Sequence, residues 1–105
     1  MSAALGRMDV REDGTTARLL ACAKATRACE ALPGESARTL VQLAGGVRLY
    51  LQARQRRLAL GALDDIERLM QGVDDADLRD AYDELVGKVR DALGVKHQGW
   101  KSRAA

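Results

Sequence analysis

An apolar stripe near the end of the chain constrains the fold more than any other feature. Between residues 74 and 94 the apolar side chains recur at intervals of four, three, four and four residues. Because an α-helix has 3.6 residues per turn, this spacing places all of them on one helix face. Asp74 or Asp75 suits the N-cap of this helix, and Gly94 suits its end. The stripe consists of Leu78, Tyr82, Leu85, Val89 and Leu93.

Similar spacing predicts further helices upstream. Thr15 or Thr16 is suited to cap a helix that runs to about Leu32 and stops before Pro33. We expect the side chains on the inward face of this helix to be small, which lets a neighbouring helix approach closely. This inward line comprises Leu19, Cys22, Ala23, Thr26 and Cys29.

A second helix is predicted over residues 36–61, with Ser36 as its cap and Gly61 as its stop. A short helical stretch over residues 62–71 follows and ends at Gly72, either as a third helix or as a continuation of the second. The stripe of the second helix is Leu40, Leu43, Ala44, Val47, Tyr50, Leu51 and Leu58.

No segment shows the alternation of apolar and polar residues that is typical of strands. We therefore predict an all-α fold, a small bundle of three or four helices over residues 15–94. Residues 1–14 and the basic tail, residues 95–105, lack helical periodicity, so we expect both to be flexible.

The predicted core is thin. Phenylalanine is absent and aromatic residues make up only 3% of the chain, so leucine, valine and alanine must supply the apolar area. Alanine buries little surface, and burial contributes only about 25 cal/mol per Å². We therefore expect a homodimer that completes the bundle.

The two cysteines, Cys22 and Cys29, are seven residues apart in a predicted helix, so about 10.5 Å separates their Cα atoms. That distance excludes a disulfide between them. We interpret them as buried small side chains in a reducing compartment, with an intermolecular disulfide or a redox switch as the alternative. No apolar run reaches the length of about 18 residues that a membrane span needs, and the expected location is cytoplasmic.

Gly45 and Gly46 lie inside the predicted second helix. An interior glycine costs about 0.8 to 1 kcal/mol relative to alanine, so the pair indicates close backbone contact or a kink. Of the two, we favour close contact.

Charge is strongly segregated along the chain. Residues 36–61 contain five arginines and no acid, for a net charge of +5. Residues 62–94 contain ten acidic against four basic residues, for a net charge of −6, and the tail adds +3. The basic segment 36–61 and the acidic segment 62–94 are electrostatically complementary, either within one chain or across a dimer.

Three of the arginines, Arg54, Arg56 and Arg57, have two interpretations. They match a phosphate-binding patch, because guanidinium groups fit phosphate oxygens. They also fit the last turn of a helix that stops at Gly61, where cations interact favourably with the helix dipole. We favour the second interpretation.

Residues with recognisable catalytic or ligand-binding spacing are not found in the sequence. The one histidine, His97, lies in the tail with no acid after Asp91 to orient it. Together with the two cysteines it gives fewer than the roughly four ligands of a zinc site. We therefore expect no enzyme activity, no cofactor and no metal.

Part of the second predicted helix resembles the central helix of bacterial flagellin export chaperones, which are helical proteins that mask an aggregation-prone helix of a partner. The resemblance covers barely a quarter of the chain. It is carried by Leu40, Val41, Gly46, Tyr50, Leu51, Gln52, Ala53, Arg54 and Gly61.

The sequence predicts a non-catalytic regulator, antiactivator or chaperone that binds an apolar or helical surface of another protein. The alternative is a nucleic-acid-binding protein that uses the arginine-rich second helix and the basic tail, with Trp100 for stacking. A helix that is apolar on more than one side meets more than one neighbour, which places the binding surface on the second helix. The predicted partner-binding residues are Leu43, Val47, Tyr50 and Leu51, with Arg54 and Arg57 as rim charges.

Overall fold

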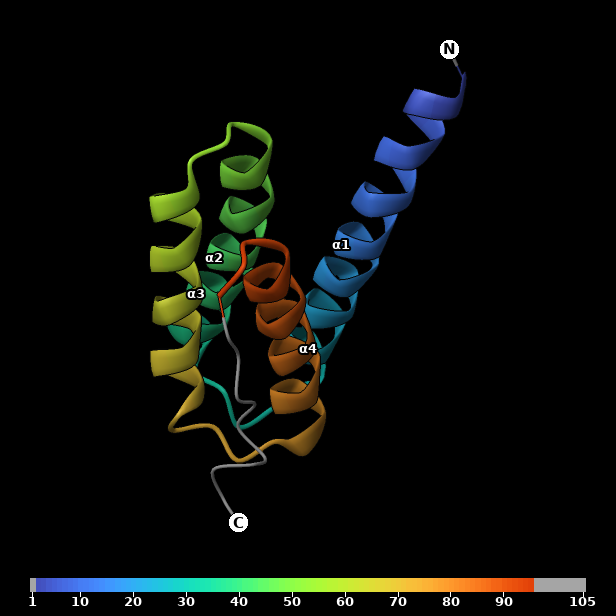
Figure 1. Cartoon of the computed structure of the whole chain (residues 1–105). Coiled ribbons are helices and arrows are strands. Elements are labelled where there is room, and N and C mark those ends of the chain that lie inside the picture. Colours follow the sequence, from blue (N-terminus) through green and yellow to red (C-terminus); the bar gives the residue numbers. More distant parts are fainter. Residues whose placement is uncertain (1, 96–105) are drawn as a thin grey trace.

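The computed structural model describes the backbone of residues 2–95 and the side chains of residues 14–95. This part of the chain folds into four helices and contains no strand (Figure 1). The prediction of an all-α fold is therefore confirmed. The helices are α1 (Ser2–Ala28), α2 (Gly34–Gln52), α3 (Arg56–Met70) and α4 (Ala76–Ala92).

Helix α4 matches its prediction closely. The side chain of Asp75 accepts a hydrogen bond of 2.9 Å from the backbone N–H of Leu78 and caps the helix. Gly94 follows the C-terminal end with a φ of +78°, a conformation that glycine adopts without steric cost. The predicted stripe is buried up to Val89, and Val86 joins it, so α4 contributes five residues to the core.

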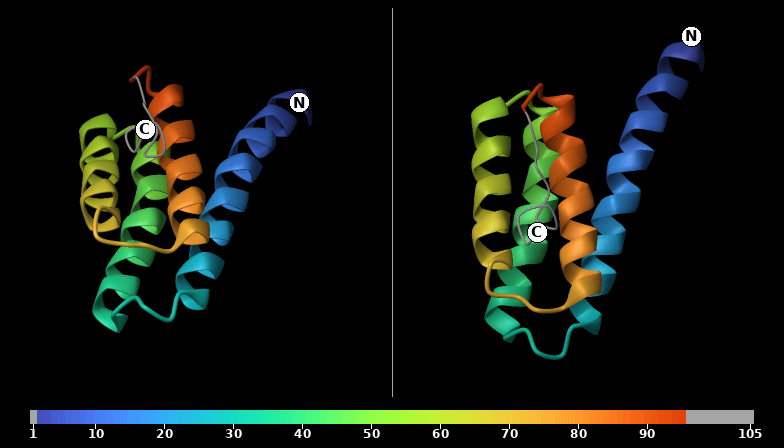
Figure 2. Two further views of the ribbon diagram at one scale, coloured as in Figure 1. Left: turned by 90° about the horizontal axis from the view of Figure 1, so that it is seen from below. Right: turned by 60° about the horizontal axis from the view of Figure 1, so that its bottom comes forward.

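Helix α1 begins at Ser2, so the predicted start of this helix at Thr15 or Thr16 is wrong. Alanine, leucine, arginine and glutamate favour helix without any apolar stripe, and the prediction relied on the stripe alone. The first half of α1 projects beyond the other helices (Figure 2). The helix also ends at Ala28 rather than near Leu32.

The inward line of α1 is confirmed where it meets α4. Cys22, Thr26 and Cys29 are buried, and both cysteines are free. The hydroxyl groups of Thr26 and Tyr82 are 2.8 Å apart in a buried hydrogen bond, and Thr26 also donates to the carbonyl of Cys22. Burial raises the pKa of the Cys22 thiol, and that of the Tyr82 phenol, to about 12 in each case.

The predicted helix over residues 36–61 is in fact two helices. Arg54 has a φ of +58°, and the chain reverses direction there. The backbone N–H of Gln55 donates to the carbonyl of Tyr50 at 2.8 Å, and that of Arg54 donates to Leu51 at 3.1 Å. This pair of bonds is the Schellman motif that ends many helices. Gly61, the predicted stop, lies inside α3 instead.

The N-terminal end of α2 also differs from its prediction. Pro33 precedes the first helical residue, Gly34, and no side chain caps this end. Ser36 therefore lies within the first turn rather than at the N-cap. Pro33 is itself the N-cap, with φ −58° and ψ 145°, and its missing N–H costs nothing because a residue at this position has no acceptor within the helix.

The helices pack as two neighbouring pairs, α2 beside α3 and α1 beside α4, while α1 also contacts α2. The contact between α3 and α4 is smaller. This arrangement leaves an outer surface where α2 and α3 run antiparallel (Figure 1).

Candidate partner-binding groove

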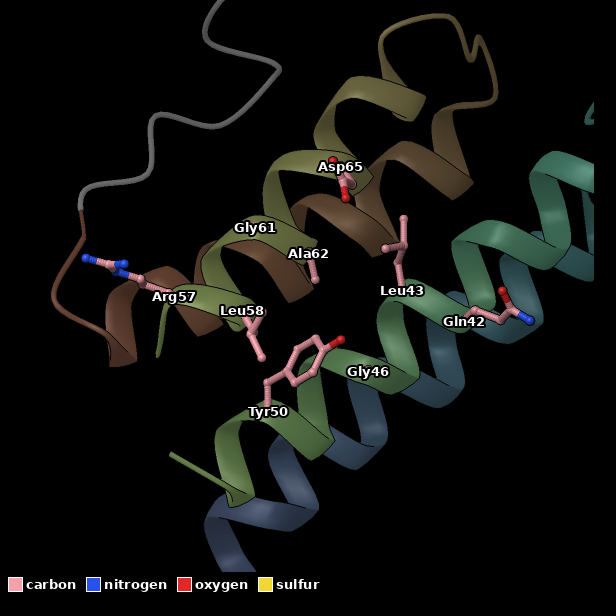
Figure 3. A pocket seen from close by; sticks show the side chains of 9 residues that line it. All are labelled: Gln42, Leu43, Gly46, Tyr50, Arg57, Leu58, Gly61, Ala62 and Asp65. Carbon is pink, nitrogen blue, oxygen red and sulfur yellow. The ribbon is translucent and has the colours of Figure 1, made fainter. Parts of the chain in front are cut away.

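An open groove of about 250 Å³ lies between α2 and α3. Leu43 and Tyr50 from α2 and Leu58 from α3 project into the space between the two helices (Figure 3). Arg57 lies at one end and Asp65 toward the other. The groove is lined by Gln42, Leu43, Gly46, Tyr50, Arg57, Leu58, Gly61, Ala62 and Asp65.

Two glycines help to keep this groove open. A Cβ atom added at Gly61 would meet no atom of the described residues within 4 Å. At Gly46 it would meet only the ring of Tyr50, which is one turn away in the same helix, at 3.6 Å. The predicted close packing at Gly45 and Gly46 is therefore wrong, because within the described residues no atom of a neighbouring helix lies within 4 Å of a Cβ built at either position.

The structure brings half of the predicted binding residues together. Leu43, Tyr50 and Arg57 line the groove. Val47 is completely buried in the core, so it is not available to a partner in this fold. Leu51 packs against the core, as Leu43 and Tyr50 also do, but unlike them it does not line the groove.

Arg54, the sixth predicted residue, is exposed in the turn between α2 and α3 and lies outside the groove. Arg54 adopts the left-handed backbone conformation that lets the chain turn from α2 into α3. Gln42 and Gly46 complete the wall on α2, and the rest of the groove wall comes from α3, which was not predicted to begin at Arg56. Leu58, Gly61, Ala62 and Asp65 were missed as site residues for this reason.

The groove has exposed apolar side chains in and beside it. Leu58 is 51% exposed, and Leu49, which is adjacent in sequence to Tyr50, is 63% exposed. Val41, also on α2, is 42% exposed but does not line the groove. Single exposed leucines are ordinary on protein surfaces, but here they accompany a concave apolar surface.

Charges on α3 are ordered along the helix. Arg56 and Arg57 occupy its first turn, where the helix dipole disfavours cations, so the predicted stabilisation of a helix C-terminus is wrong for these two residues. Arg56 donates instead to the carbonyl of Leu93 at 3.3 Å, beyond the end of α4. Further along α3 come the acidic residues Asp64, Asp65 and Glu67.

The acidic part of α3 is partly neutralised within the chain. Arg90 of α4 forms ion pairs with Asp64 at 2.9 Å and with Glu67 at 3.2 Å. Arg68 pairs with Asp65 at 3.3 Å, but both side chains of that pair are at least half exposed. Arg57 has no hydrogen bond or ion pair with any described residue.

The described residues also lack two other features, a metal-ion cluster and a membrane-spanning helix. They contain no cluster of three or more histidine, cysteine or acidic side chains placed to hold a metal ion. None of their helices combines the length and the apolar character required to cross a bilayer. His97 and Trp100 lie outside the described residues.

The fold and this groove define the chain as an all-α bundle with an open apolar groove between two antiparallel helices. Comparison with protein-family models, with curated proteins and with solved structures finds no match.

Proposed function

We propose that the chain is a non-catalytic protein-binding regulator or chaperone whose groove between α2 and α3 receives an apolar helix face of a partner. The observation that supports this proposal is the groove itself, because it is concave, lined with leucine, tyrosine, glycine and alanine, and open to solvent. Helix-in-groove recognition uses this combination of apolar anchors and open space.

The glycines favour a helix as the bound element. Each interior helical glycine costs about 0.8 to 1 kcal/mol relative to alanine, and no intramolecular contact at Gly61 offsets that cost. Without a side chain at Gly46 and Gly61, the backbone of a bound helix can approach closely, as small residues allow in other helix pairs. Arg57 and Asp65 would then meet polar groups at the rim of the complex.

A library of displayed amphipathic helical peptides tests this proposal. The selected peptides are measured against the wild-type chain and against Leu58→Glu, which places a carboxylate in the groove. We expect Leu58→Glu to weaken binding at least tenfold, because burying an unpaired charge against an apolar helix is costly.

Val41→Glu is the matched control. It introduces the same charge at an exposed apolar position that lies on α2, outside the groove. We expect it to bind the peptides as the wild type does, with circular dichroism unchanged in both variants. Equal loss in the two variants, or selected peptides that are insensitive to Leu58→Glu, would contradict the proposal.

A further inference from the structure

We infer that the groove face binds a second copy of this chain, with the two α3 helices antiparallel about a two-fold axis at Gly61. The inference rests on the proposed function, because it assigns an occupant to the same groove. It is carried by the order of charges on α3 and by the place of Gly61 within that order.

The exposed charges in the first three turns of α3 change from basic to acidic, and Arg68 near the end of the helix is basic again. Arg56 and Arg57 lie in its first turn, while Asp64 and Asp65 lie about two turns later. In a parallel pair of α3 helices, like charges would face each other. An antiparallel pair brings the basic turn of each copy beside the acidic turn of the other, which is the attractive arrangement.

Gly61 is the midpoint of this pattern. It follows Arg57 by four residues and precedes Asp65 by four, so about 12 Å of helix separates the two charges symmetrically around it. A two-fold axis beside Gly61 therefore sets Arg57 of each copy at the height of Asp65 of the other, and the contact forms twice. Because Gly61 is exposed with open space around it, the two helices can approach closely.

The apolar part of the groove lies beside this contact. Leu58 is 51% exposed, and Leu43 and Tyr50 line the same groove from α2. Leu58 and the exposed parts of Leu43 and Tyr50, which also pack against the core, supply apolar area that the chain does not bury by itself. Because few large side chains are available to the core, burying this area in a dimer would add stability to a chain of this size.

Arg57 is free to act across the contact, since it has no hydrogen bond or ion pair with a described residue. Asp65 already pairs with Arg68, but that pair is exposed and spans one helical turn, and such pairs contribute little. Asp65 can therefore accept Arg57 of the second copy at small cost.

Sedimentation velocity on the full chain between 1 and ~100 µM tests this inference, using two single charge reversals, Arg57→Glu and Asp65→Arg. In either variant alone, both symmetric contacts become repulsive, and we expect the dimer dissociation constant to rise at least tenfold. When the two variants are mixed, each contact joins opposite charges again. We therefore expect a heterodimer with close to wild-type affinity.

Arg38→Glu is the control, because it reverses the charge of an exposed arginine near the N-terminal end of α2. We expect its dissociation constant to match the wild type. A wild-type chain that remains monomeric at ~100 µM, or a mixture of the two variants that remains monomeric, overturns the inference. If the wild type is monomeric but binds helical peptides in a manner that depends on Leu58, the inference fails while the proposed function stands.

Discussion

Arg54 shows how one residue can determine the path of the chain without any signal in its own chemistry. Arginine favours helix, and so do the glutamine and alanine residues around it. Nevertheless Arg54 adopts a left-handed conformation and ends α2, in the position that glycine holds at the end of α4. For a residue with a side chain this conformation costs roughly 1 to 2 kcal/mol.

Glycine at this position should therefore stabilise the chain. We expect Arg54→Gly to raise the free energy of unfolding by about 1 kcal/mol, because the relief of backbone strain outweighs the greater freedom that glycine has in the unfolded state. Urea denaturation at one fixed low protein concentration measures this change, since any dimer would make stability depend on concentration.

Arg54→Ala separates the backbone effect from the loss of charge. Alanine removes the guanidinium group but keeps the strained conformation, so its free energy of unfolding should stay within about 0.5 kcal/mol of the wild type. A similar gain in both variants would show that the charge, rather than φ, limits stability.

At the scale of helices, α4 could be predicted from sequence because its cap, its stripe and its terminal glycine all agree. The break between α2 and α3 could not, because no glycine or proline stands there. One signal was nevertheless present. Residues 54–57 are all polar, which interrupts the apolar stripe where a continuous helix would need a core residue.

The missed break also explains why only half of the groove could be predicted. On α2 the stripe includes residues of two faces, and sequence spacing does not say which of them turns inward. Val47 is completely buried, whereas Leu43 and Tyr50 pack against the core with only part of their surface and also line the groove beside α3. The opposite wall of the groove is formed by α3. This helix begins at Arg56, and the sequence pattern did not indicate a helix start there.

Leucines of α4 and of the groove should respond differently to truncation. Leu85 is completely buried, so Leu85→Ala should lower the free energy of unfolding by about 2 to 5 kcal/mol through lost burial and a residual cavity. Leu58→Ala, at a half-exposed position, should change it by no more than about 0.5 kcal/mol in dilute solution. Urea denaturation of both variants tests this, and comparable losses would place Leu58 in the folded core.

At the scale of the whole molecule, the segregation of charge does not produce one basic surface in the described residues. Arg38 lies near the start of α2, whereas Arg54, Arg56 and Arg57 lie at its opposite end, about 24 Å away along the helix. Arg48 is partly buried and has a partner of its own. The arginine-rich segment therefore does not form the continuous stripe that a nucleic acid backbone would follow.

Duplex DNA binding should accordingly be weak and only slightly dependent on salt. A protein that neutralises several phosphates shows a slope of log affinity against log salt of about −0.9 for each of them. With the arginines dispersed and ten acidic residues in residues 62–94, we expect a slope no steeper than about −2 for this chain. Fluorescence anisotropy of a labelled duplex across a salt series measures it. A slope near −5 with nanomolar affinity at physiological salt would instead show that the arginines and the basic tail act together, and the nucleic-acid alternative would replace the groove as the main function.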